Sequence, residues 1–190
     1  MATISSSNYT VGGAHLYYSS TIAHTDLLNG TVFENTDHNL GNVVTSEISP
    51  DVTYLDHYIS VNGKRVKDKV VTTMSSVMIN FTFDEMNDDN LNRFFQGNLT
   101  ASRISVVQNA LDEGSAKLVV ETDIGQDMAY VIPKCTIRPD GALSLSEEDW
   151  HTAPMVLEVL QYQSGDSSNA TVNATWVANP YGIVDVNARS

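Results

Sequence analysis

Histidine, cysteine and carboxylate side chains often bind metals or carry out catalysis, and their spacing in this chain supports neither role. The five histidines stand at positions 15, 24, 38, 57 and 151, with no pair four residues apart and no carboxylate at metal-ligand spacing. Cys135 is the single cysteine, so it cannot form a disulfide within the chain, and its type favours a small buried side chain. We therefore predict no metal site and no cofactor.

The motifs of several common enzyme classes are also missing from the sequence. It contains no G-x-S-x-G, no Walker loop and no G-x-G-x-x-G. The acidic residues are spread along expected strands and turns, and none of them form a defensible pair of general acid and base. We predict that the chain is not an enzyme.

Charge is distributed unevenly along the chain. The net charge is −13, yet four of the ten basic residues, Lys64, Arg65, Lys67 and Lys69, follow directly after the turn signal Asn62-Gly63. One interpretation is a loop that docks on an acidic surface of another subunit, and the alternative is a solvated hairpin tip whose lysines discourage stray strand pairing. Binding to nucleic acid would need a broad basic face, which this acidic chain does not offer.

A strand followed by a helix is the clearest local pattern. Apolar side chains alternate with polar ones over residues 77–83, as in a strand with one buried face. A helix is predicted over residues 88–96, because Asn87 can cap it and two acids follow at its positive end. Leu91, Phe94 and Phe95 give this helix one apolar face, and Gly97 is placed to end it with a left-handed residue.

The remaining pattern is mostly strands separated by turn residues, which predicts a mainly β protein and one domain over residues 1–190. Residues 165–173 are predicted to be a flexible polar loop. The strand candidates are residues 43–48, 52–61, 69–73, 77–83, 104–108, 117–122, 128–137, 143–145 and 155–162.

The order of these elements resembles that of the tail tube, or major tail, proteins of tailed bacteriophages. The residues that carry the resemblance lie between Leu40 and Gly97 and include LDHYISVNG, the charged run KRVKDK, the strand end FTFDE and the helix NLNRFF. The resemblance implies a β-sandwich or barrel-like tail tube fold with one short flanking α-helix. It also implies hexameric rings that stack into a tube, the conduit for genome ejection into the host.

Two segments are expected to contact neighbouring subunits. The first is the basic loop at residues 60–70, which contains Lys64, Arg65, Lys67 and Lys69. The second is the N-terminal segment, residues 1–25, which carries no Asp, Glu, Lys or Arg and includes Leu16, Tyr17 and Tyr18. An uncharged segment with several apolar groups is expected to become ordered against a partner.

The net negative charge of the chain suits the inner wall of a tube through which double-stranded DNA slides. Phosphates are repelled by acidic side chains, whereas a basic wall would bind them and release counterions. The candidate lumen acids are the strand residues Glu47, Glu121 and Glu158. We expect transient, non-specific passage of DNA, no insertion into a membrane, and assembly in the host cytoplasm into the tail of a virion. The resemblance implies the tape measure, the tail tip or baseplate, and the terminator as further partners.

A binding module of another class remains the alternative function. A β-sandwich could recognise glycans or a surface receptor through its loops, and the richness in Asn, Thr and Tyr would support that interpretation. Six N-x-S/T sequons occur, but no secretory signal pattern accompanies them, so glycosylation is the weaker interpretation. The sequence leaves open whether the tail is contractile and whether the tube belongs to a phage, a bacteriocin or a secretion system.

Overall fold

The computed structural model describes residues 11–108, 111–124, 127–147 and 149–186. In that part of the chain the fold is mainly β, as predicted, with one large antiparallel sheet and short helices. The elements in chain order are β1 (Val11–Ser19), α1 (Gly30–Phe33), β2 (Val43–Val61), β3 (Lys64–Phe83), α2 (Asp88–Phe94), β4 (Asn98–Thr100), β5 (Arg103–Ser105), β6 (Glu113–Ile124), β7 (Met128–Pro139), β8 (Ala153–Val159), α3 (Ala170–Ala178) and β9 (Ile183–Val186).

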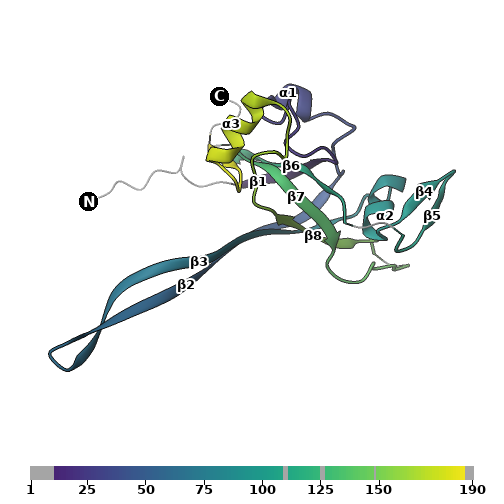
Figure 1. Cartoon of the computed structure of the whole chain (residues 1–190). Coiled ribbons are helices and arrows are strands. Elements are labelled where there is room, and N and C mark those ends of the chain that lie inside the picture. The colour runs from purple at the N-terminus through teal and green to yellow at the C-terminus, as the bar shows by residue number, and fades with distance from the viewer. Residues whose placement is uncertain (1–10, 109–110, 125–126, 148, 187–190) are drawn as a thin grey trace.

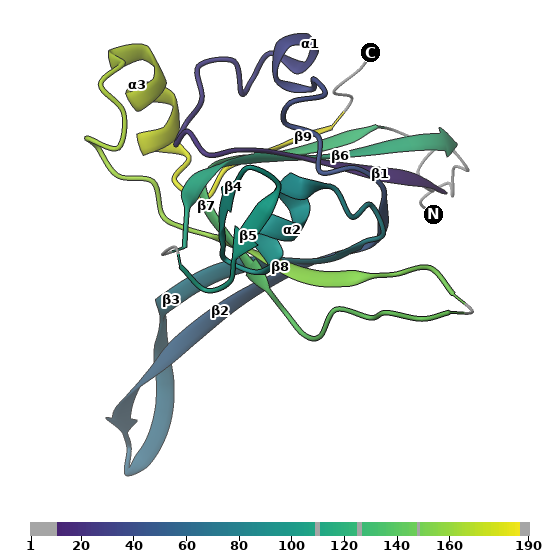
Figure 2. The same ribbon diagram turned by 90° about the vertical axis from the view of Figure 1, so that its right-hand side faces the viewer.

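The large sheet curves around the core like a partly closed barrel. Its strand order is β1-β6-β7-β8-β3-β2, and β9 pairs with β7. The two ends of this order approach each other, because β1 is hydrogen-bonded to the segment that precedes β2. The amide of Tyr18 donates to the carbonyl of His38 at 2.7 Å, and the amide of Leu40 donates to the carbonyl of Leu16 at 3.0 Å. Figure 2 shows β1 and β6 above α2, with β8, β3 and β2 below it.

Two hydrophobic cores lie on opposite faces of β1, β6 and β7. The larger core fills the inside of the curved sheet and contains Phe94 of α2 together with side chains of five strands. The smaller core lies on the other face, beneath α1 and α3, and contains Phe33 and Trp176. An ion pair fixes α1 to the sheet, since Nζ of the buried Lys117 lies 2.6 Å from Oε1 of Glu34.

Helix α2 is confirmed and begins as its cap residue predicts. The side chain of Asn87 accepts a hydrogen bond from the amide of Asn90 at 2.8 Å. The helix ends differently from the prediction, because Gln96 adopts the left-handed conformation with φ of 47° and Gly97 does not. Gly97 instead permits a close approach of Ile104, which a side chain at that position would block. Phe94 is the deeply buried aromatic of the helix, whereas Phe95 is only partly buried.

The chain has more helix than the one flanking element that was predicted. The polar loop expected at residues 165–173 is wrong at its end, since α3 begins at Ala170. The side-chain oxygen of Asn169 accepts hydrogen bonds from the amides of Thr171 and Val172 and thereby caps this helix. Of the predicted strands, residues 143–145 contribute only an isolated bridge between Ser144 and Thr152.

Candidate assembly interface

The longest feature of the molecule is a hairpin that leaves the body of the protein. Strands β2 and β3 are 19 and 20 residues long, but β8 pairs with β3 only over residues 77–83. Residues 51–76, called the extension here, reach out beyond that pairing (Figure 1). At about 3.3 Å per residue the extension is about 40 Å long. Figure 1 shows it as a narrow two-stranded ribbon that projects away from the other strands and helices.

The turn at the end of the extension forms as the sequence predicts. Asn62 and Gly63 both have positive φ, 51° and 76°, which is the conformation of the two-residue turn that suits a twisted hairpin. On each side of this turn, two predicted strands merge into one longer strand, β2 or β3. The register shifts between Thr53 and Tyr54 and again between His57 and Tyr58, so two irregularities interrupt the alternation of side chains.

All four predicted basic residues lie near the tip of the extension. Lys64 follows the turn directly and pairs with Val61, while Lys69 pairs with His57. The guanidinium of Arg65 lies 4.5 Å from the centre of the Tyr58 ring. The prediction that this loop contacts a neighbouring subunit is not tested by a single chain and stays a prediction.

Two acidic side chains of the extension, one on each strand, lie close to a lysine and a histidine. Lys67 Nζ lies 2.7 Å from Asp56 Oδ1, and His57 Nδ1 lies 2.5 Å from Asp68 Oδ1. Sequence reasoning singled out the cations and missed Asp56 as a partner, although the pattern of an antiparallel hairpin could have placed it. These contacts link the side chains of the two strands of the ribbon.

Apolar side chains are exposed along the whole extension. Two-stranded ribbons are marginally stable alone in water, and large exposed apolar surfaces mark sites where a partner binds. The exposed apolar residues are Val52 (37%), Tyr54 (61%), Leu55 (63%), Tyr58 (40%), Ile59 (41%), Val61 (44%), Val66 (45%), Val70 (51%), Val71 (54%) and Met74 (59%). The extension therefore has the composition of a protein interface, and these apolar side chains are left exposed within the subunit.

The predicted interface role of Leu16, Tyr17 and Tyr18 is wrong. These residues belong to β1, which pairs with β6, and they are 0%, 8% and 3% exposed within the subunit itself. Leu16 and Tyr18 pack in the larger core and Tyr17 in the smaller one. Residues 1–10 of the predicted segment lie outside the described residues.

The three candidate lumen acids share one face of the sheet. Alternation along the strands places Glu47, Glu121 and Glu158 on the face turned away from the larger core. Glu158 lies 3.8 Å from Arg138, and Glu121 lies 3.9 Å from His15. Beside Glu47 there is an open hollow of about 400 Å³, which polar and apolar residues of β2, β3 and β8 line together with Asp140.

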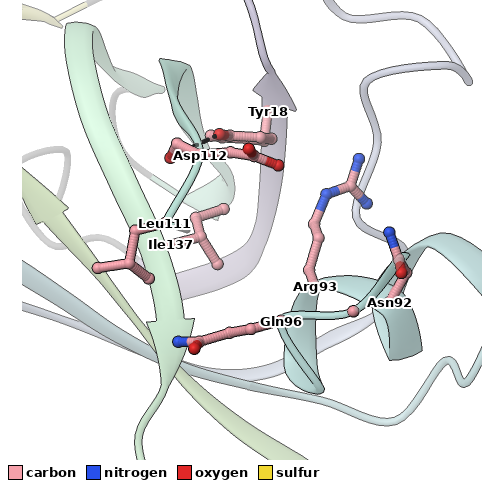
Figure 3. Close-up of a pocket in the computed structure, with 8 residues that line it drawn as sticks. Tyr18, Asn92, Arg93, Gln96, Leu111, Asp112 and Ile137 are labelled. Carbon is pink, nitrogen blue, oxygen red and sulfur yellow. Dashed lines mark hydrogen bonds between the residues drawn. The ribbon is translucent and has the colours of Figure 1, made fainter. Parts of the chain in front are cut away.

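A second, much smaller hollow lies between α2, β1 and β7 (Figure 3). The hydroxyl of Tyr18 donates to the carbonyl of Asp112 at 3.3 Å, and the Arg93 guanidinium lies 5.5 Å from the Tyr18 ring centre. Burial raises the pKa of Tyr18 well above its usual value. The cavity volume is about 40 Å³, which suits water rather than a small-molecule ligand of about 300 Å³ or more.

The described residues contain neither a cluster of metal ligands nor a membrane-spanning helix. Within them, no group of three or more His, Cys, Asp or Glu side chains could hold a metal ion. None of the helices in the described ranges is long and apolar enough to cross a membrane. Cys135 is fully buried, and burial raises the pKa of its thiol far above the usual value.

Comparison with known proteins gives one partial match. A family described as "Protein of unknown function UCP028589" is similar to this chain over residues 35–119. The matched range contains the whole extension, α2 and the first half of β6. No curated protein matches the chain.

Proposed function

We propose that this chain is a structural subunit of a phage tail tube, which forms hexameric rings that stack into a conduit for genome ejection. The observation that carries the proposal is the extension, a ribbon about 40 Å long whose side chains are exposed on both faces within the subunit. Such a ribbon gains order and stability when a partner covers it.

Charge supports a second copy of the same chain as that partner. The extension, residues 51–76, carries four basic and three acidic side chains, a sum of +1, so the other residues of the chain sum to −14. Opposite charges of this size favour encounter between the extension of one copy and the body of another. The resemblance of residues 40–97 to tail tube proteins supports the same partner.

The lumen wall is the second element of the proposal. Glu47, Glu121 and Glu158, on the sheet face turned away from the larger core, would line the bore and repel the phosphates of passing DNA. The Debye length is about 8 Å at physiological salt, so this repulsion acts where the duplex comes close to the wall. The role is structural and non-enzymatic, with the tape measure, tail tip or baseplate, and terminator proteins as further partners in the virion.

Electron microscopy of the purified protein tests the proposed function. Negatively stained samples at increasing protein concentration should contain six-fold rings and then tubes with a central channel. A protein that stays monomeric at every concentration, and that binds glycans instead, would contradict the proposal.

A further inference from the structure

The two faces of the extension differ in chemistry. Opposed residues in an antiparallel pair point to the same face, and successive residues point to opposite faces. The register pairs Leu55 with Val71, and Ile59 with Val66. With Val61 and Met74, these residues form one face, called the apolar face here, and each is 41–63% exposed.

The opposite face, called the polar face, carries charge and hydrogen-bonding groups. Asp56, Tyr58 and Ser60 lie on it from β2, opposite Val70, Lys67 and Arg65 of β3. Side-chain contacts agree with this assignment, because Lys67 reaches Asp56 and Arg65 lies over Tyr58 without crossing the ribbon. Apolar side chains occur here too, at Tyr54 and Val70, but they stand among charges.

We propose that the apolar face of the extension packs against the body of a second copy of this chain, while the polar face stays in contact with water. Burial of the apolar face removes aliphatic surface from water, whereas burial of the polar face would desolvate the Asp56–Lys67 pair. This inference rests on the proposed function, because it names the side of the extension that makes the contact between subunits.

Several features of the chain favour a second copy as the occupant. Lys64 and Lys69 lie on the apolar face itself, opposite Val61 and His57, and the chain outside the extension carries a net charge of −14 by the sum above. A face that combines aliphatic side chains with two lysines fits a partly apolar surface of an acidic protein, and every copy of this chain offers an acidic body.

Matched substitutions one residue apart test this assignment. Ile59→Asp and Val71→Asp place a carboxylate on the apolar face, and Ser60→Asp and Thr72→Asp place the same group on the polar face of the same strands. All four residues are exposed in the subunit, so monomer folding, followed by circular dichroism, should be equal. Each variant adds the same charge to the extension, so a difference between the two pairs reports the face alone.

The readout is the protein concentration at which half of the purified protein is assembled, measured by sedimentation velocity. We expect this concentration to rise about tenfold or more for Ile59→Asp and Val71→Asp, and to rise clearly less for Ser60→Asp and Thr72→Asp. Equal effects on the two faces, or a larger effect on the polar face, would overturn the inference while leaving the assembly of the wild type in place. If the wild type itself stays monomeric, the proposed function fails, and the inference fails with it.

Discussion

The ion pair between Lys117 and Glu34 gives the sharpest prediction for the stability of the subunit. The side chain of Lys117 is 6% exposed and that of Glu34 is 14% exposed, with 2.6 Å between Nζ and Oε1. Glu34→Gln removes the negative charge and leaves the lysine buried without its counter-ion. Loss of one partner of a buried pair costs about 3 to 5 kcal/mol. For a chain of this size that lowers the melting temperature by about 6 to 20 °C.

A double variant separates charge burial from packing. Lys117→Met combined with Glu34→Leu replaces both charges by apolar side chains, and such replacements are often neutral or stabilising. A surface control is Glu158→Gln, because Glu158 and Arg138 are about one-third exposed and 3.8 Å apart. Pairs of that kind contribute about 1 kcal/mol or less.

Urea denaturation, followed by circular dichroism, gives the free energy of unfolding of each variant. We expect the free energy of unfolding of Glu34→Gln to lie far below that of the wild type. The values for the double variant and for Glu158→Gln should lie near that of the wild type. The reasoning is refuted if Glu34→Gln unfolds at the same urea concentration as Glu158→Gln. A double variant as unstable as Glu34→Gln would mean that packing, and not the unpaired cation, causes the loss.

Three further predictions concern the tip, α2 and alkaline pH. Glu substitution at both Lys64 and Arg65 changes the charge of the extension from +1 to −3, so sedimentation velocity should show weaker assembly at an unchanged urea midpoint. Unaltered assembly would mean that the charge of the extension does not contribute to assembly. Phe94→Ala should cost about 3 to 5 kcal/mol in urea denaturation and Phe95→Ala less, because only Phe94 is deeply buried; the reverse order would be inconsistent with the packing of α2. Burial raises the pKa of Tyr130 to about 12, so the folded state keeps a proton that the unfolded chain releases near pH 10, and stability should fall between about pH 10 and 12. Tyr130→Phe should make that fall smaller in unfolding curves measured at several pH values, and an identical pH dependence would count against the burial argument.

Local patterns predicted the strand and helix around residue 85 because each signal there acts over a few residues. The alternation of residues 77–83 reports one buried face, and Ile79, Phe81 and Phe83 do lie in the larger core. Asn87 caps α2 through a single hydrogen bond to a residue three positions away. The Asn62-Gly63 turn is equally local.

The length of β2 and β3 could not be predicted, because irregular positions hide the continuous pairing. Pro50 lacks an amide hydrogen and resembles a strand end, yet it sits in β2, at the outer end of the sheet order, where the missing donor is tolerated. The two register shifts within the extension also move the apolar residues out of phase with a simple alternation. The exposure of the whole ribbon carries no local signal, since the same residues would suit a buried strand.

The error at the N-terminal segment has a different cause. Leu16, Tyr17 and Tyr18 form an uncharged aromatic run, and such a run suits a subunit core as well as an interface. Composition does not distinguish these two environments. Pairing with β6, which lies about a hundred residues later in the chain, decides between them. The role of Asn90 was not predicted either. Its buried side-chain amide donates to the carbonyls of Leu40 and Glu85, and nothing in the neighbouring sequence indicates these contacts.

The central claim is that the extension serves assembly and contributes little to the fold of the subunit. Replacement of residues 51–76 by Asn-Gly closes the hairpin between Pro50 and Val77, which are already opposed, and keeps the whole pairing of β3 with β8. Sedimentation velocity of the wild type and this variant at equal concentration tests the claim most directly. We predict rings and tubes for the wild type, and a folded monomer with a similar melting temperature for the variant. Assembly of the shortened protein at the concentration of the wild type would contradict the account.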